Sequence, residues 1–211
     1  MKSDVITVSS KLEGKEEALK AAERFCSYHG ISGKNAMTLR LLTEETVCMI
    51  HGILDDFSGR FWIDSENVSG GLMCRLHLSA DKPVAPAQET QLLGVSTSGK
   101  NESARGILGK IRDAFRVSMQ YSGDGTYMNE YTAMNAWYSL GMNHTAGTTA
   151  GYMDQQMWSL TSYRSNIASG GESEGEQWDE LEKSIIAKLA DDVKVWFKKT
   201  TTDVVIEKLL K

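Results

Sequence analysis

Three carboxylates stand where ionised side chains could do chemistry. Glu44 and Glu45 lie within a stretch, roughly 35–54, whose apolar face has helical spacing and consists of Leu39, Leu42, Thr46, Ile50 and Ile53. On this helical wheel Glu45 falls at the edge of the apolar stripe, whereas Glu44 points away from it. A half-buried glutamate can serve as a general base. Glu45 is therefore the candidate catalytic residue, and a solvated or salt-bridged side chain is the alternative.

Asp81 begins the sequence Asp81-Lys82-Pro83, directly after a strand-like segment in which apolar and polar residues alternate. An aspartate at the exit of a strand either forms a turn through its own side chain or presents its carboxylate to a ligand. Both interpretations of Asp81 stay open at this point.

A near-match to a phosphate-binding loop lies at residues 94–101, with the sequence GVSTSGKN. It fits GxxxxGK, but Asn101 replaces the serine or threonine that would hold magnesium, and polar residues 87–91 precede it where a buried strand is needed. The segment predicts either a P-loop-like nucleotide site or a flexible loop rich in glycine and serine.

The composition excludes several classes of protein. A net charge of −5 does not favour a nucleic-acid partner, which needs a basic surface. The histidines and the three cysteines lack the spacing of a metal site, so no metal is expected, and the cysteines are expected to be reduced. No apolar run is long enough for a signal peptide or a membrane span, which predicts a cytoplasmic protein with no membrane partner.

Regular periodicity on both sides of residues 81–175 indicates the elements that must position these side chains. In chain order we expect a strand at 5–8, helices at 15–28 and 35–54, strands at 60–64 and 72–78, a helix at 176–190, and strands at 193–197 and 203–207. This order predicts an α+β fold, a two-layer sandwich in which helices cover one face of a mixed sheet. We expect one domain over 1–211.

Residues 81–175 differ in character from the rest, being polar, rich in methionine and interrupted by glycine and serine. We interpret them as a lid-like insertion of loops and helices, with helices at 103–119 and 153–167. The segment and its borders also hold most of the tyrosines and two tryptophans, namely Tyr121, Tyr127, Tyr131, Trp137, Tyr138, Tyr152, Trp158 and Tyr163. Such side chains form either a second small core or a surface for a protein partner or a homodimer.

Two segments carry a resemblance to a known family. The helix LRLLTEETVCMI (39–50) is similar to the Asn-box helix of the GHKL (histidine-kinase-like) ATPases, and nearest to that of the bacterial anti-sigma-factor serine kinases. The ending LADDV (189–193), followed by a hairpin, is similar to the last helix and strands of those kinases. The resemblance covers about residues 4–80 and 176–210 and implies a GHKL fold with an ATP and magnesium site beside the Asn-box helix.

The resemblance assigns family roles to particular residues of this chain. It implies that Glu45 matches the glutamate that polarises the attacking group and that Met49 stands where the family has a magnesium-binding asparagine; an alternative register uses Glu44 and Cys48. Magnesium requires oxygen ligands, which a thioether does not supply. Asp81 matches the aspartate that accepts the adenine amino group, although Pro83 replaces the glycine beside it. Residues 181–187 also contain none of the glycines expected around the phosphates.

We therefore expect a regulatory or binding protein with an eroded ATP site and no ATP turnover. The implied partner is a protein such as a sigma factor or its antagonist. The alternative is an ATP-dependent serine/threonine protein kinase or ATPase, with Glu45 as base and Asp81 on adenine. A P-loop-like nucleotide binder through residues 94–101 is a second alternative.

Overall fold

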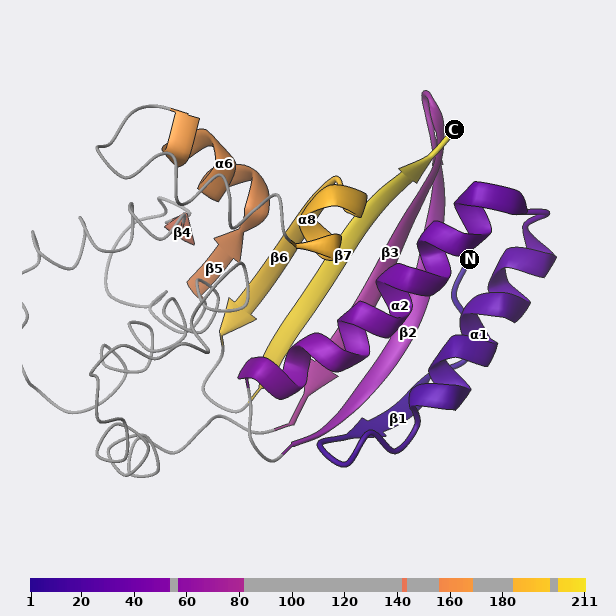
Figure 1. The fold of residues 1–211 in the computed structure, drawn as a ribbon, viewed down its shortest axis with the longest axis horizontal. Helices are drawn as coiled ribbons and strands as arrows, with labels where there is room; N and C mark the ends of the chain where they lie inside the picture. Colours follow the sequence, from indigo (N-terminus) through magenta and orange to yellow (C-terminus); the bar gives the residue numbers. More distant parts are fainter. Residues whose placement is uncertain (54–56, 82–141, 144–155, 169–183, 198–200) are drawn as a thin grey trace, which may run out of the picture.

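The computed structural model describes residues 1–53, 57–81, 142–143, 156–168, 184–197 and 201–211 (Figure 1). Its helices and strands, in chain order, are β1 (Ile6–Ser9), α1 (Lys15–Tyr28), α2 (Gly33–Ile53), β2 (Ser58–Val68), β3 (Gly71–Ala80), β4 (Met142–Asn143), β5 (Gln156–Ser159), α6 (Leu160–Ala168), α8 (Ile185–Leu189), β6 (Asp192–Phe197) and β7 (Thr202–Leu210). The α+β class predicted from the sequence is confirmed.

The described strands form a seven-stranded sheet in the order β1-β2-β3-β7-β6-β5-β4. Every pairing between them is antiparallel, so the expectation of a mixed sheet was wrong. The reason is that β3 pairs along its length with β7, which arrives from the opposite direction at the C-terminus. The last strand of the chain consequently lies in the middle of the sheet.

Helix α1 covers the positions that were predicted for it, 15–28. It begins after Gly14, whose φ of 81° is left-handed and whose α-carbon lies so close to the Thr7 carbonyl that a Cβ would stand 2.0 Å from that oxygen. Its buried face consists of Ala18, Leu19, Ala21, Ala22, Phe25 and Cys26. The small alanines let α1 pack closely against β1, β2 and α2.

Helix α2 crosses the sheet diagonally in front of β3 and β7 (Figure 1). Leu39, Leu42 and Val47 are fully buried on it, as are the methyl-bearing side chains of Thr43 and Thr46. Both threonine hydroxyls donate to the carbonyl four residues earlier, which satisfies them inside the core. The predicted apolar face is confirmed at Leu39, Leu42 and Thr46; the side chains of Ile50 and Ile53 lie outside the described part.

Both predicted hairpins are confirmed. Strands β2 and β3 pair from Gly59↔Ala80 to Val68↔Gly71, which leaves Ser69-Gly70 as the connection. Strands β6 and β7 pair from Asp192↔Glu207 to Phe197↔Thr202. Each hairpin has alternating burial, which places one set of side chains against the helices and the other set on the opposite face.

The segment predicted as an insertion contributes to the sheet itself. The helix expected at 153–167 was wrong over 156–159, because these residues form strand β5 and the helix α6 begins at Leu160. Residues 156–159 are a strand because they pair with β6. In this pairing Trp158 lies opposite Val195, and its indole is fully buried. The helix expected at 103–119 lies outside the described residues, as do positions 176–183 of the one expected at 176–190. The expectation of one continuous helix up to 190 was wrong, because Ser184 is extended and caps α8, which covers only Ile185–Leu189.

The three cysteines are free thiols, as predicted. Cys26 and Cys74 are buried in the core between α1 and β3, and Cys48 is partly exposed on α2. Burial raises the pKa of the Cys74 thiol to about 11, which keeps it protonated and unreactive at neutral pH.

Candidate functional site

The carboxylates singled out on α2 lie in two different settings. Glu44 accepts a hydrogen bond from Lys15 of α1 at 2.9 Å, and this contact is the main cause that lowers the pKa of Glu44. Glu44 is half-buried although its wheel position faces away from the sheet, because α1 packs on that side of α2. Lys15 therefore holds Glu44 as a link between the two helices.

Glu45 is half-buried and makes no hydrogen bond or ion pair with any residue that the structure describes. Its carboxylate has no internal partner there, so the assignment of Glu45 as a base stays a prediction. Met49 lies one turn further along α2, and its side chain is outside the described part.

Asp81 is exposed directly after β3, where its N–H donates to the Ser58 carbonyl at 2.7 Å. Its carboxylate lies 4.0 Å from the guanidinium of Arg60 on β2. Arg60 alternates with the buried Phe61 and so belongs to the sheet face that α2 does not cover. The structure thus brings Asp81 toward Arg60 and does not join it to Glu45 by any contact between described residues.

Some of the remaining candidates from the sequence lie within the residues that the structure describes, and others lie outside them. The P-loop-like segment 94–101 lies outside them, as do most of the aromatic residues of the insertion. Trp158 and Tyr163 are described and are both buried in the core, with ring centroids 6.1 Å apart. These two side chains are core and contribute no surface for a partner.

A different surface gathers functional side chains, namely the sheet face that α1 and α2 leave uncovered, which we call the open face. It carries alternate residues of four adjacent strands: Arg60, Trp62, Asp64 and Glu66 of β2, Met73, Arg75, His77 and Ser79 of β3, Asp203, Val205, Glu207 and Leu209 of β7, and Asp192, Lys194 and Trp196 of β6. Cross-strand pairing arranges them in rows. One row runs Trp62, His77, Val205 and Lys194, and the next has Ser79, Asp203 and Trp196.

Trp62 and His77 form a stacked pair of rings on the open face. Their rings are stacked with centroids 4.8 Å apart and an angle of 6° between planes. Asp64 holds the imidazole from the side, with 2.6 Å between Oδ2 and His77 Nε2. Lys2 places its ammonium 4.4 Å from the Trp62 ring centroid, a cation–π contact.

Burial lowers the pKa of His77, and the charges of Arg75 and Lys2 act in the same direction, against the opposing effect of Asp64. The imidazole is therefore neutral at pH 7, and the stack on Trp62 is a contact between two uncharged rings. Its Nε2 lies toward Asp64 on the neighbouring strand β2.

A chain of ion pairs borders this aromatic region on the side of the row that contains Arg75 and Glu207. Arg75 contacts Glu66 at 2.7 Å, Asp64 at 3.3 Å and Glu207 at 3.9 Å. Lys194 in turn contacts Glu207 at 2.8 Å. Both cations are thus compensated within the sheet.

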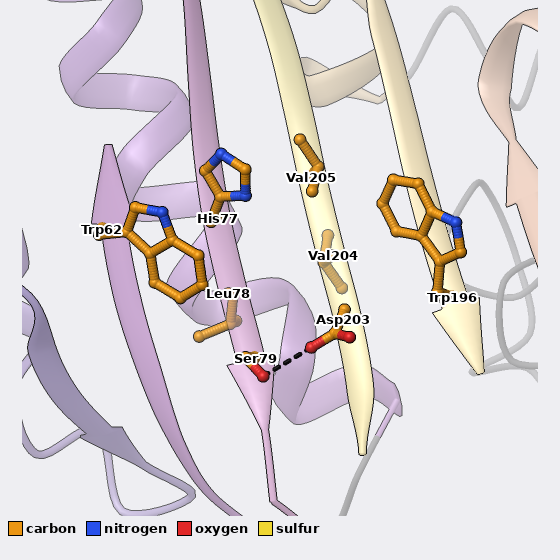
Figure 2. Close-up of a pocket in the computed structure, with 8 residues that line it drawn as sticks. All are labelled: Trp62, His77, Leu78, Ser79, Trp196, Asp203, Val204 and Val205. Carbon is orange, nitrogen blue, oxygen red and sulfur yellow. Dashed lines mark hydrogen bonds between the residues drawn. The ribbon is translucent and has the colours of Figure 1, made fainter. Parts of the chain in front are cut away.

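Between Trp62 and Trp196 lies a shallow groove of about 310 Å³, lined by Trp62, His77, Leu78, Ser79, Trp196, Asp203, Val204 and Val205 (Figure 2). The Trp62–His77 stack stands on one side of it and Trp196 on the other, with strand β7 between them. At one end the Ser79 hydroxyl donates to Asp203 Oδ1 at 2.5 Å. The groove combines aromatic walls with a few polar side chains, as small binding pockets commonly do.

Sequence reasoning missed this groove, although one signal pointed to it. Trp62 and Trp196 each alternate with buried residues of their strands, which places a large aromatic side chain on the less buried face. Neither position reveals that both face one groove, because they are far apart in the sequence and only the order of β2, β3, β7 and β6 brings them together.

No family model, curated protein or solved structure matches the chain significantly. Within the described ranges, no group of three or more histidine, cysteine, aspartate or glutamate side chains is placed to hold a metal ion. None of the described helices is long and apolar enough to cross a membrane.

Proposed function

We propose that this chain is a cytoplasmic regulatory protein that acts by binding a protein partner and does not turn over ATP. The observation that carries the proposal is the groove of the open face, where Trp62, His77 and Trp196 present aromatic surface away from the helical layer. Tryptophan at a partly exposed, concave position is typical of protein-binding surfaces. The resemblance to the anti-sigma-factor kinases makes a sigma factor or its antagonist the expected partner.

The α2 side of the sheet supports the absence of ATP turnover. Lys15 engages Glu44. The resemblance assigns the thioether residue Met49 to the position of the magnesium-binding asparagine, where it supplies no oxygen ligand. Asp81, which would have to accept from the adenine, has its carboxylate near Arg60. We propose that these residues maintain a fold of the GHKL type after the nucleotide contacts were lost.

Titration calorimetry of the full chain with a non-hydrolysable ATP analogue and magnesium tests the catalytic half of this proposal. We expect no saturable binding in the micromolar range. The expected magnesium position has a thioether instead of an oxygen ligand, so the magnesium that accompanies the phosphates is not held. Micromolar binding that disappears in Asp81→Asn would overturn the proposal in favour of the kinase.

The binding half is tested by titrating a purified sigma factor, or its antagonist, from the same genome into the full chain. Trp196→Ala should weaken the complex at least about tenfold if the groove is the contact surface, since interface tryptophans dominate binding energies. Glu45→Ala on α2 is the matched control and should leave the affinity unchanged. An affinity that responds to Glu45→Ala and not to Trp196→Ala contradicts this assignment.

A serine/threonine kinase or ATPase is the second candidate, and one observation favours it. Glu45 is half-buried with no hydrogen bond or ion pair to a described residue, as a general base available to substrate would be. Phosphate release that is equal in the wild type and in Glu45→Ala would exclude this candidate.

A further inference from the structure

Residues 1–3 form a short arm that pairs with β2 beyond the end of β1, and we call it the N-terminal arm. Lys2 lies opposite Asp64 as an isolated antiparallel bridge. The Ser3 N–H donates to the Ile63 carbonyl at 2.7 Å, and the Ile63 N–H donates to the Ser3 hydroxyl at 2.9 Å. The first two residues of the arm are exposed, as are the two that join it to β1. Little burial holds this arm, so a modest change in free energy decides whether it is docked.

The indole of Trp62 is covered on both faces, by the arm on one side and by β3 on the other. His77 of β3 stacks on the ring with 4.8 Å between centroids. Asp64 pairs with Arg75 of β3 across one edge of β2 and with Lys2 across the other, so the arm and β3 flank β2. The Lys2 ammonium, 4.4 Å from the Trp62 centroid, therefore lies on the face opposite His77.

The two contacts on the indole are anchored differently. His77 belongs to a strand that is paired on both sides, by β2 and β7, and its Nε2 lies 2.6 Å from Asp64 Oδ2. Lys2 makes no ion pair with any residue that the structure describes. Its ammonium is held by the indole through a cation–π contact, which is weak at an exposed position. If the groups on the two faces repel each other, the arm is therefore the side that leaves.

The charges around His77 couple its protonation to the arm. In its own row and the two adjacent rows, the charged residues of the described strands and the arm are Arg60 and Asp64 of β2, Arg75 of β3, Asp203 and Glu207 of β7, Lys194 of β6, and Lys2. Burial is the main cause that lowers the pKa of His77, Asp64 raises it, and Arg75 and Lys2 lower it further. Coupling is reciprocal, so a proton on His77 weakens the docking of Lys2 by the factor with which Lys2 opposes that proton.

We propose that the N-terminal arm is a pH-sensitive strap, docked on Trp62 and the edge of β2 while His77 is neutral and released when His77 takes up a proton. The imidazolium stays in place because it forms an ion pair with Asp64. Release uncovers the outer face of Trp62 and the N–H and carbonyl groups of Ile63 that the arm had paired. This face of the indole is turned away from the groove, so the inference does not depend on the proposed function.

Amide hydrogen exchange of the full chain, followed by NMR at about pH 7.5 and about pH 5, measures the docked fraction. The Ile63 amide reports on the arm, because its acceptor is the Ser3 hydroxyl. The Phe61 amide is the internal control, since Phe61 lies opposite Ile6 of β1 on the same edge. The pKa of His77 lies below 6.5, so release occurs below that pH. We expect the protection factor of Ile63 to fall about fivefold and that of Phe61 to stay within about twofold.

Two variants of Lys2 test the reciprocal effect on His77. Lys2→Gln removes the positive charge and should raise the pKa of His77, measured from its ring signals by NMR. Lys2→Arg keeps a cation over the indole and should leave that pKa near the wild-type value. Lys2 is exposed, so both variants keep the fold.

Two histidine variants show which imidazole is responsible. His77→Gln should remove the pH dependence of Ile63 protection. His29 is the other histidine near the arm, because its Nε2 lies 3.2 Å from the hydroxyl of Ser65, which pairs with Met1. His29→Gln is the matched control and should keep the dependence.

Three outcomes would overturn the inference. The first is an Ile63 protection factor that changes no more than that of Phe61. The second is a pKa of His77 that Lys2→Gln leaves unchanged. The third is a pH response that His29→Gln removes and His77→Gln retains. If His77→Gln leaves Ile63 unprotected at both pH values, the pKa of His77 in Lys2→Gln decides the question.

Discussion

His77 shows how one side chain is set by groups from three strands. Trp62 and Asp64 of β2 hold its ring and its nitrogen, Arg75 lies on its own strand, and Val205 of β7 is its cross-strand neighbour. The carboxylate favours the protonated ring, whereas burial and the nearby cations favour the neutral one. Burial is the largest of these effects, so the folded state binds the proton more weakly than the unfolded chain does.

The pH dependence of stability follows from this shift. Because the folded pKa of His77 lies below 6.5, the unfolded chain binds more protons as the pH falls through 6.5, and the free energy of unfolding decreases. Above pH 6.5 this contribution is fully present. We expect His77→Gln to flatten the dependence measured by urea denaturation between about pH 7.5 and pH 5.

His29 provides a comparison for that measurement. Burial and the charge of the chain's N-terminal ammonium lower its pKa too, so it acts with the same sign, and the double variant with His29→Gln should have the flattest profile. If His77→Gln retained the wild-type slope, its imidazole would not be the buried neutral group described above.

At the scale of elements, the turn between β2 and β3 requires a glycine, because the neighbouring backbone leaves no space for a side chain. Gly71 has a φ of 145°, and a Cβ there would lie 2.0 Å from the carbonyl oxygen of Leu210 on β7. Gly71 is thus the point at which the hairpin meets the end of the central strand. Gly30, which follows α1, also has a positive φ, 65°, but a Cβ there would meet nothing within 4 Å.

These two glycines make a matched pair of substitutions. Gly30→Ala should cost about 1 kcal/mol of unfolding free energy, the ordinary penalty of a left-handed backbone for a residue with a Cβ. Gly71→Ala should cost about 3 kcal/mol or more, because strand β7 must also move away. Equal losses in chemical denaturation would mean that the contact with Leu210 is relieved without cost.

For the whole molecule, the position of β7 has the largest consequence. The final strand of the chain pairs with β3 on one side and β6 on the other, so it connects the N-terminal half of the sheet to the C-terminal half. Val204 and Ile206 on it are fully buried in the shared core. A chain without β7 has two separate sheet edges and an exposed core.

Removal of residues 202–211 should therefore abolish the cooperative unfolding transition followed by circular dichroism in urea. Removal of Lys211 alone is the control and should leave a cooperative transition, because that residue is exposed and lies beyond the strand. A cooperative transition in the longer truncation would indicate that the N-terminal elements form a stable unit by themselves.

The sequence by itself determined the local elements. Helix α1 and both hairpins follow from periodicity and turn residues, and the buried face of α2 at Leu39, Leu42 and Thr46 follows from a helical wheel. These properties depend on residues within a few positions of each other. For that reason no knowledge of the rest of the fold was needed.

Only the tertiary structure decided the strand order, the antiparallel pairing throughout the described sheet, and the groove. Trp62, Asp203 and Trp196 come from three strands, and Lys15 reaches Glu44 from a neighbouring helix. Strand β5 forms where periodicity suggested helix, because β6 offered an edge to Trp158. Each of these results depends on which elements pack together, since cross-strand register and helix packing join residues whose spacing in the chain carries no signal of their contact.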